Sequence, residues 1–477
     1  MTSVNTAVLS NDSQLMQLFE RLSSSHLRQL RLYLKSPYFN RRDDVYALFE
    51  YLRADLKRKN PKRGREEVFA VIYPGEPLDD GRLNLVVHLL LNHIKRFLAL
   101  QEFEEKKQMQ ELYLCRSLRQ LDAEKAYKKA FSKLKEDLQG SPYRNVGYHY
   151  LNYQLLEEEY VHTASQSRVG RMNLEELTRE LTVFYLADIL RHSCSMLTAQ
   201  SIGKEAYQLE LQEEVLRYVE RSPVKNTPAI AIYHRVYHLL ANMESVDEEG
   251  FNALEKLIEQ HWQQFPPHEI RDIYLLAINY CIQWLNRGQR QFIAKALRLY
   301  KIALERGILL ENGQLSKFTY NNVLMLALAS QELDWADYFL HEFRDKLPEK
   351  ERESIFHYNL AVYYFRKPDH DKALSLLNQQ LAFDDIFYNL NSRSMLLQIY
   401  YEKGLFDLLT SHLDSFTTYI SRKKQLGYHR DNYINLIQFV RKLLSLPKGD
   451  KAGRAQLRES ITATKALADK QWLLGQV

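Results

Sequence analysis

The chain has 477 residues, of which 45% are hydrophobic and 26% are charged. Its 65 Lys and Arg residues nearly balance 60 Asp and Glu residues, and the resulting net charge of +5 is too small to indicate a general affinity for nucleic acid or membranes. The three cysteines, Cys115, Cys194 and Cys281, lack the paired spacing of metal or redox motifs, which favours a reducing compartment. We see no basic start followed by an apolar run, and the apolar stretch 83–94 is too short to span a bilayer, so we expect a cytoplasmic protein without membrane insertion.

Residues 1–103 predict a helical N-terminal module. Candidate helix N-caps are found in Asn11-Asp12-Ser13 and in the serines at 23–25, Pro37 ends the second helix, and the acidic pair 79–80 introduces a long helix over about 82–101. Two interpretations remain open for this module. It is either a separate domain or the atypical end-cap that a helical array needs to cover its first apolar face.

Residues 36–40 read Ser-Pro-Tyr-Phe-Asn. This segment is similar to one found near the N-terminus of uncharacterised bacterial helical-repeat proteins, and the similarity implies no activity. In structural terms, we expect Asn40 or Asp43 to cap the following helix, with Tyr38 and Phe39 holding the turn against the core.

A run of basic residues follows between positions 53 and 65, where seven Lys or Arg side chains accompany one Asp. Clustered positive charge can bind phosphates without fixed geometry, so this loop is the alternative functional site, that of a nucleic-acid-associated regulator. The other interpretation is a solvated loop around Asn60 and Pro61. The candidate patch consists of Lys57, Arg58, Lys59, Lys62, Arg63 and Arg65.

Residues 104–228 remain helical in pattern but with a blurred period, and we interpret them as degenerate helical repeats whose number the sequence leaves open by one. From 229 to 477 a helix-pair pattern recurs. Small or apolar residues stand twelve apart at Ala361 and Ala373, and small residues let two antiparallel helices approach closely. The same spacing occurs in three other pairs, Ala241 with Ala253, Leu324 with Ala336, and Leu397 with Leu409.

This period in the thirties, with Gly404 at one turn and Pro348 closing another copy, resembles the tetratricopeptide repeat. The resemblance implies an all-α fold: a tetratricopeptide-like α-α superhelical solenoid that follows the N-terminal helical module. A last hairpin over 433–446 and 457–474 is expected to cap the array, with Trp472 folding back onto its core. The thirty-one tyrosines are expected mainly to fill the grooves between helices.

In such repeats, function resides in the groove lined by the first helix of each pair, where a peptide or partner helix can lie. We therefore expect a non-catalytic scaffold for protein–protein interactions, with a protein or peptide partner favoured over nucleic acid. Asn322 and Asn359 occupy equivalent places in successive repeats, where tetratricopeptide proteins often use asparagine to hold a peptide backbone. The residues predicted to face the groove are Arg235, His238, Asn242, Arg271, Tyr274, Asn321, Asn322, Tyr358, Asn359 and Arg366.

Enzyme motifs are incomplete in this chain. His234 and His238 lie on one face of a predicted helix at the spacing of a metal-ligand pair, but no third ligand is apparent from the sequence. His429-Arg430-Asp431 is not followed by the asparagine of a kinase catalytic loop. We therefore predict no catalytic site, no metal and no cofactor.

Overall fold

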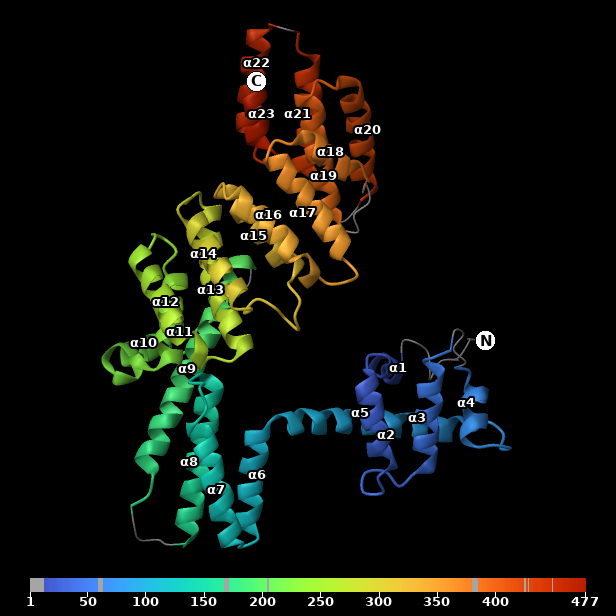
Figure 1. Ribbon diagram of the computed structural model, residues 1–477, viewed down its shortest axis with the longest axis vertical. Coiled ribbons are helices and arrows are strands. Elements are labelled where there is room, and N and C mark those ends of the chain that lie inside the picture. Colours follow the sequence, from blue (N-terminus) through green and yellow to red (C-terminus); the bar gives the residue numbers. More distant parts are fainter. Residues whose placement is uncertain are drawn as a thin grey trace. The chain divides into compact units, whose positions relative to one another are not determined.

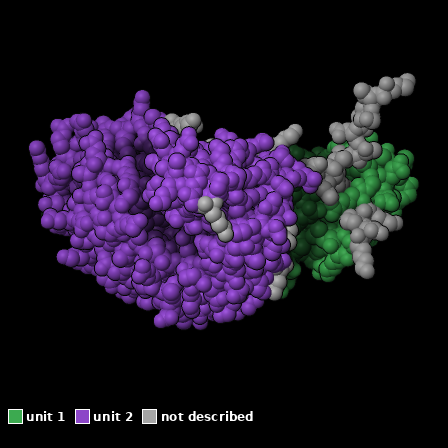
Figure 2. All heavy atoms as spheres, turned by 90° about the horizontal axis from the view of Figure 1, so that it is seen from above, with its two compact units in different colours: residues 1–142, 146–185 green, residues 143–145, 186–477 purple. Residues whose placement is uncertain are grey.

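The computed structural model describes residues 13–58, 63–166, 171–203, 206–379, 385–423, 426–427, 429–447 and 449–477. Within these residues the protein is all-α, as predicted, and its β-type pairing is limited to an isolated bridge between Glu311 and Gln314 (Figure 1). The chain divides into two compact units, shown in different colours in Figure 2: residues 1–142 with 146–185, and residues 143–145 with 186–477. The domain boundaries expected at 103 and 228 stay predictions.

The first unit begins with a helical core organised around its longest N-terminal helix. The helices are α1 (Gln14–Phe19), α2 (Ser24–Lys35), α3 (Asp43–Asp55), α4 (Arg65–Ile72) and α5 (Asp80–Glu105). Ser13, Ser23 and Asp79 accept backbone hydrogen bonds as N-caps of α1, α2 and α5, which fixes where these helices begin. Helix α5 packs against each of the other four, and Leu83, Leu90 and other apolar residues on it are fully buried in their common core.

The turn between α2 and α3 is held by Asn40, although not in the expected way. The Asn40 amide nitrogen donates to the carbonyl oxygens of Leu34 and Arg42, each at 3.0 Å, so the side chain bridges both ends of the turn. Phe39 stacks on Tyr33 with ring centroids 4.4 Å apart. Two expectations were wrong: neither Asn40 nor Asp43 is the N-cap of α3, and Tyr38 is 82% exposed because it points away from the core that Phe39 fills.

The long helix expected over about 82–101 is α5, which is slightly longer at both ends and includes the apolar stretch 83–94. Among the described residues, it is the one helix long and apolar enough to cross a membrane by length and composition. Its apolar side chains include Leu83, Ile94 and Phe97, which contribute to the N-terminal core, and a core helix passes the same test.

The rest of the first unit is a smaller helical cluster made by α6 (Lys107–Gln120), α7 (Glu124–Gln139) and α8 (Val146–Gln166), which pack on one another. Glu158 of α8 is 2% exposed and is held by Arg119 through two hydrogen bonds of 2.7 and 3.1 Å. Helix α9 (Leu174–Ile202) follows, and the division between the two units falls within its residue range.

The second unit is a series of helical hairpins. Its helices are α10 (Gln212–Arg221), α11 (Pro228–Ala241), α12 (Glu248–His261), α13 (Pro267–Asn286), α14 (Phe292–Glu305), α15 (Lys317–Ala329), α16 (Leu333–Glu342), α17 (Arg352–Arg366), α18 (His370–Gln379), α19 (Ile386–Glu402), α20 (Phe406–Arg422), α21 (His429–Ser445), α22 (Lys451–Ala463) and α23 (Lys470–Gln476). Short 3-10 turns lie at Pro223–Asn226, Trp262–Gln264 and Arg344–Lys346. Each of the pairs from α11·α12 to α21·α22 packs together, and consecutive pairs pack on each other (Figure 1).

At three of the four expected helix crossings, both residues of the pair are buried. Ala361 and Ala373 are fully buried in the contact between α17 and α18, and the pairs Leu324 with Ala336 and Leu397 with Leu409 are also fully buried. Ala241 is the exception: it is the last residue of α11 and is exposed, so it does not mark a crossing.

Large aromatic side chains fill the space between the helices of the array. Tyr233, Tyr274, Tyr280, Tyr320 and Tyr363 are among the largest fully buried side chains, as expected for tyrosines that fill inter-helix grooves.

At the C-terminus, the expected second helix over 457–474 is two helices, separated at residues where Asp469 adopts a left-handed φ of 49°. Leu473 is fully buried in the C-terminal core, and the Trp472 indole donates to Glu402 of α19 at 2.8 Å, so the chain end folds back as predicted.

Candidate functional site

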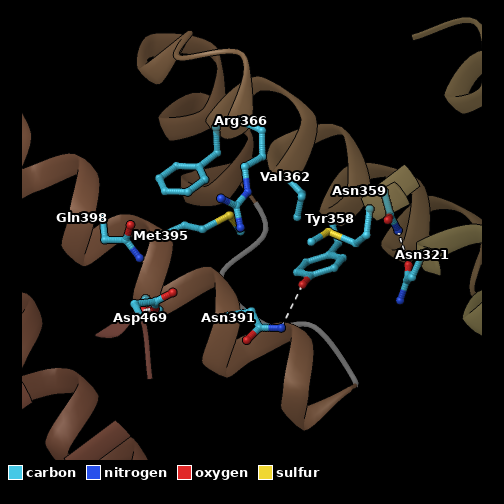
Figure 3. A pocket seen from close by; sticks show the side chains of 12 residues that line it. Asn321, Tyr358, Asn359, Val362, Arg366, Asn391, Met395, Gln398 and Asp469 are labelled. Carbon is cyan, nitrogen blue, oxygen red and sulfur yellow. Dashed lines mark hydrogen bonds between the residues drawn. The ribbon is translucent and has the colours of Figure 1, made fainter. Parts of the chain in front are cut away.

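A cavity of about 350 Å³ lies on the surface of the hairpin array between α15, α17 and α19 (Figure 3). A volume of this size accommodates a small ligand or an anchoring side chain. Its lining comprises Asn321, Met325, Tyr358, Asn359, Val362, Phe365, Arg366, Asn391, Ser394, Met395, Gln398 and Asp469. The lining comes from first helices of successive pairs, with Asp469 added from the turn before α23.

Two asparagines hold one side of the cavity. Asn359 is 2% exposed, and its amide nitrogen donates to the Asn321 side-chain oxygen at 2.7 Å and to the Ile355 carbonyl at 2.8 Å. Asn321 in turn donates to the Tyr388 hydroxyl at 2.8 Å. A buried amide without partners costs free energy, so these bonds both satisfy Asn359 and fix the orientation of Asn321 at the cavity wall.

Two stacked tyrosines belong to the same network of hydrogen bonds. The rings of Tyr358 and Tyr388 lie 3.9 Å apart and nearly parallel, at 6°. Asn391 donates to the Tyr358 hydroxyl at 3.1 Å (Figure 3). Asn391 also accepts a hydrogen bond of 2.7 Å from Tyr433. Burial raises the pKa of Tyr358 above its ordinary value and raises the pKa of Tyr388 to about 12, so both phenols are neutral at neutral pH.

Opposite charges and flexible apolar side chains complete the wall. Arg366, at the end of α17, is exposed and reaches into the cavity, while Asp469 lies on the other side and accepts a hydrogen bond from the Ser394 hydroxyl (Figure 3). Met325 and Met395 supply apolar surface, and methionine adapts its shape to different partners. The cavity therefore presents an apolar centre with amide, cationic and anionic groups around it.

The structure brings four of the ten predicted groove residues together in this cavity: Asn321, Tyr358, Asn359 and Arg366. A fifth, Arg271, lines a separate cavity of about 340 Å³, where it forms an ion pair with Glu311. The other five line neither of these cavities.

Two of those five interact with side chains on α14 or at its C-cap. Tyr274 is 1% exposed, and its hydroxyl accepts a hydrogen bond of 3.3 Å from Arg306, the C-cap of α14, so it fills the contact within its own hairpin. Asn322 is exposed, and its side chain interacts with the Tyr300 hydroxyl of α14. The neighbour Asn321, one position earlier, is the residue that contacts Asn359.

The remaining three lie on or next to α11. Arg235 and His238 are partly exposed, and Asn242 is an exposed C-cap of the helix. The Nε2 atoms of His238 and His234 are 3.1 Å apart. Burial lowers the pKa of His234 to about 4 and also lowers that of His238, with Arg235 adding to both effects.

In the basic loop, most of the described charges are paired within the fold. Asp55 is 1% exposed and accepts a hydrogen bond of 3.1 Å from Arg63, which also pairs with Glu20 at 2.9 Å. Arg58 lies 3.6 Å from the same Asp55 carboxylate, and Arg65 pairs with Asp80. Lys57 is exposed. Lys59 and Lys62 lie outside the described residues.

A further cavity, of about 490 Å³, has a buried acid in its wall that sequence reasoning missed. Glu269, at the start of α13, is 3% exposed and accepts hydrogen bonds from Asn145 at 2.5 Å and from Tyr233 at 2.9 Å. These partners satisfy the carboxylate, which fits a structural role for Glu269.

Sequence reasoning also missed Asn391 and Asp469 in the main cavity. Asn391 follows Asn359 by fewer residues than the period, so a search at fixed spacing passes over it. Asp469 belongs to no repeat. No protein-family model, curated protein or solved structure matches this chain.

Proposed function

We propose that the chain is a non-catalytic interaction scaffold that binds an extended peptide, or one face of a partner helix, in the cavity between α15, α17 and α19. The observation that carries the proposal is the wall of that cavity, where amide groups, two opposite charges and two methionines converge on about 350 Å³ of open volume. Asparagine and glutamine amides both donate and accept, which matches the alternating N–H and C=O groups of a peptide backbone.

We also propose that the hairpins form a tetratricopeptide-like solenoid whose first helices line the binding face. The buried crossings at Ala361 with Ala373, and the packing of α15 on α17 and of α17 on α19, support this arrangement. Alternate packing of this kind leaves the inner faces of first helices available to a ligand. The similarity of the 36–40 segment to bacterial helical-repeat proteins stays a prediction.

A nucleic-acid partner for the basic loop has weaker support. Unpaired Lys and Arg side chains favour binding to nucleic acid because they neutralise phosphates and release the counterions condensed on them. Arg58, Arg63 and Arg65 are engaged with acidic side chains of the fold, and Asp55 offsets part of their charge. The cavity, by contrast, presents polar groups outward.

The proposal is tested by selecting peptides from a random display library against the full-length chain and measuring the affinity of the selected peptides in solution. Arg366→Ala removes an exposed cavity group that supports little of the core. Asn391→Ala also removes hydrogen bonds to the Tyr358 and Tyr433 hydroxyls, so its free energy of unfolding is measured alongside its affinity. Each is expected to weaken binding about fivefold, because loss of one hydrogen bond costs about 1 kcal/mol. The matched control is Asn322→Ala, an exposed asparagine on α15 outside the cavity lining.

Equal affinity of the selected peptides for the control and for both cavity variants contradicts the proposal. A labelled oligonucleotide titrated in parallel addresses the alternative. Tight binding that weakens with added salt and is lost in Lys57→Ala with Arg58→Ala shifts the function to the basic loop.

A further inference from the structure

A three-residue cluster joins α10 to α11 away from the cavity lining. Glu220 stands one residue before the end of α10, whereas His234 and His238 are four residues apart and therefore share one face of α11. One ligand atom from each of the three residues lies within 4.8 Å of the other two. The sequence showed only the histidine pair, and the fold supplies the third group.

The contact between the two rings needs a physical explanation. The Nε2 atoms of His234 and His238 are 3.1 Å apart, with ring planes at 80° to each other. Two neutral imidazoles can face each other in this way only if one nitrogen carries the proton, or if a cation lies between the two lone pairs. The Glu220 carboxylate, 3.9 Å from the His238 Nε2, adds negative charge to the same point.

We propose that Glu220, His234 and His238 bind a divalent transition-metal ion, with Zn²⁺ as the best match, through one carboxylate oxygen and two Nε2 atoms. Zinc takes nitrogen and oxygen ligands at about 2.0–2.2 Å, which places neighbouring tetrahedral ligand atoms about 3.3 Å apart. The two nitrogens are already near that separation. Glu220 must close by a fraction of an ångström toward His238 and must also approach His234, whose ligand atom lies within 4.8 Å, and its half-exposed side chain permits this movement.

Two histidines with one carboxylate leave a fourth tetrahedral position for water or for a donor from a partner. The ion would link the end of α10 to the middle of α11 across the Pro223–Asn226 turn. The charged neighbours affect cation binding in opposite directions. The positive charge of Arg235 disfavours a bound cation, and the negative charge of Asp247 favours one. Asp247 itself is the N-cap of α12, where its carboxylate accepts from Gly250.

The test is a Zn²⁺ titration of the full-length chain after chelator treatment, using competition with a chromophoric chelator. One Zn²⁺ per chain is expected at this site, and His238→Ala and His234→Ala are each expected to weaken the affinity at least about tenfold, since even outer partners of a metal site contribute that much. Glu220→Gln keeps the size of the side chain and removes its charge, so it should weaken binding less than either histidine variant.

The matched control is His357→Ala, because His357 also lies on a helix beside a carboxylate, Glu353, four residues away at 3.6 Å, but it has no second histidine. It is expected to bind Zn²⁺ like the unaltered chain. Thermal melting provides a second measurement: Zn²⁺ should raise the melting temperature of the unaltered chain and of His357→Ala, and should not raise that of His238→Ala. Absence of Zn²⁺ binding, or binding that His234→Ala and His238→Ala leave unchanged, overturns the site and leaves the ring contact as a hydrogen bond.

Discussion

The N-terminal core of α1 to α5 and the hairpin array from α11 to α22 use the same kind of helix in different ways. In the N-terminal core, one long helix contacts the other four, and the arginines of the basic loop are paired with acids that include the buried Asp55. In the array, each helix packs mainly on its sequence neighbours, and asparagine, arginine and aspartate side chains face a cavity. A cluster of charge in the sequence is therefore a stronger candidate for binding where the fold leaves it without acidic partners.

The largest expected effect concerns the packing of the array. Ala373→Arg forces a long charged side chain into a fully buried crossing with Ala361, and we expect it to lower the free energy of unfolding by at least about 3 kcal/mol. Chemical denaturation of the second unit measures the change. Asn378→Arg, at an exposed position of the same helix, is the control. An unchanged midpoint for Ala373→Arg would reject the pairing of these two helices through their alanines.

The second effect concerns the basic loop. Asp55→Ala removes the buried acid and leaves Arg63 with Glu20 as its other partner, so we expect a loss of about 2 kcal/mol in unfolding free energy. Glu66→Ala, an exposed acid in the first turn of α4, should change little. If Asp55→Ala instead kept full stability and gained affinity for an oligonucleotide, the loop arginines would be binding groups rather than structural ones.

A smaller effect is pH-dependent and again lies in the N-terminal core. The hydrogen bond from Arg42 lowers the pKa of Asp44 from 3.8 to about 2. Because the folded state holds this carboxyl deprotonated, its contribution to stability is present above about pH 4 and is lost as the pH falls through about 2. Asp44→Asn should therefore differ from the unaltered chain at pH 5 and converge with it at the acid end.

Denaturation midpoints measured at several pH values check this convergence. The neighbouring Asp43→Asn, an exposed change in the same helical turn, is the control. A difference between Asp44→Asn and the unaltered chain that stays constant down to pH 2 would contradict the role of the Arg42 contact.

The smallest expected effect on stability belongs to the cavity. Arg366 is exposed, so Arg366→Ala should change the free energy of unfolding by less than about 0.5 kcal/mol while weakening peptide binding. Asp55→Ala should have the opposite pair of effects, lowering the free energy of unfolding while leaving peptide binding unchanged. The two variants therefore distinguish the N-terminal core from the cavity. A loss of stability in Arg366→Ala as large as that in Asp55→Ala would remove the contrast between them.

The sequence predicted the helical class, and it predicted buried residues in three of the four helix pairs because small and apolar residues at regular spacing indicate where helices pack, as at Ala361 and Ala373. It predicted the cavity only in part. Asn322 and Asn321 differ by one position, which on a helix is a rotation of about 100°, enough to move a side chain from one face to another. Asn391 and Asp469 reach the cavity through tertiary packing that follows no repeat. Glu220 was missed for the same reason, since it lies on a different helix from its histidines.

The most direct test of the cavity as a binding site is site-specific photocrosslinking with a selected peptide. Met325 lines the cavity and is 44% exposed, whereas Tyr338 of α16 is 57% exposed and lies outside the cavity lining. A benzophenone amino acid placed at each position in turn, in the full-length chain, reports which surface the peptide touches. Crosslinking from position 325 and not from position 338 is the predicted result. Crosslinking from 338 alone, or equally from both, would contradict a binding site between α15, α17 and α19.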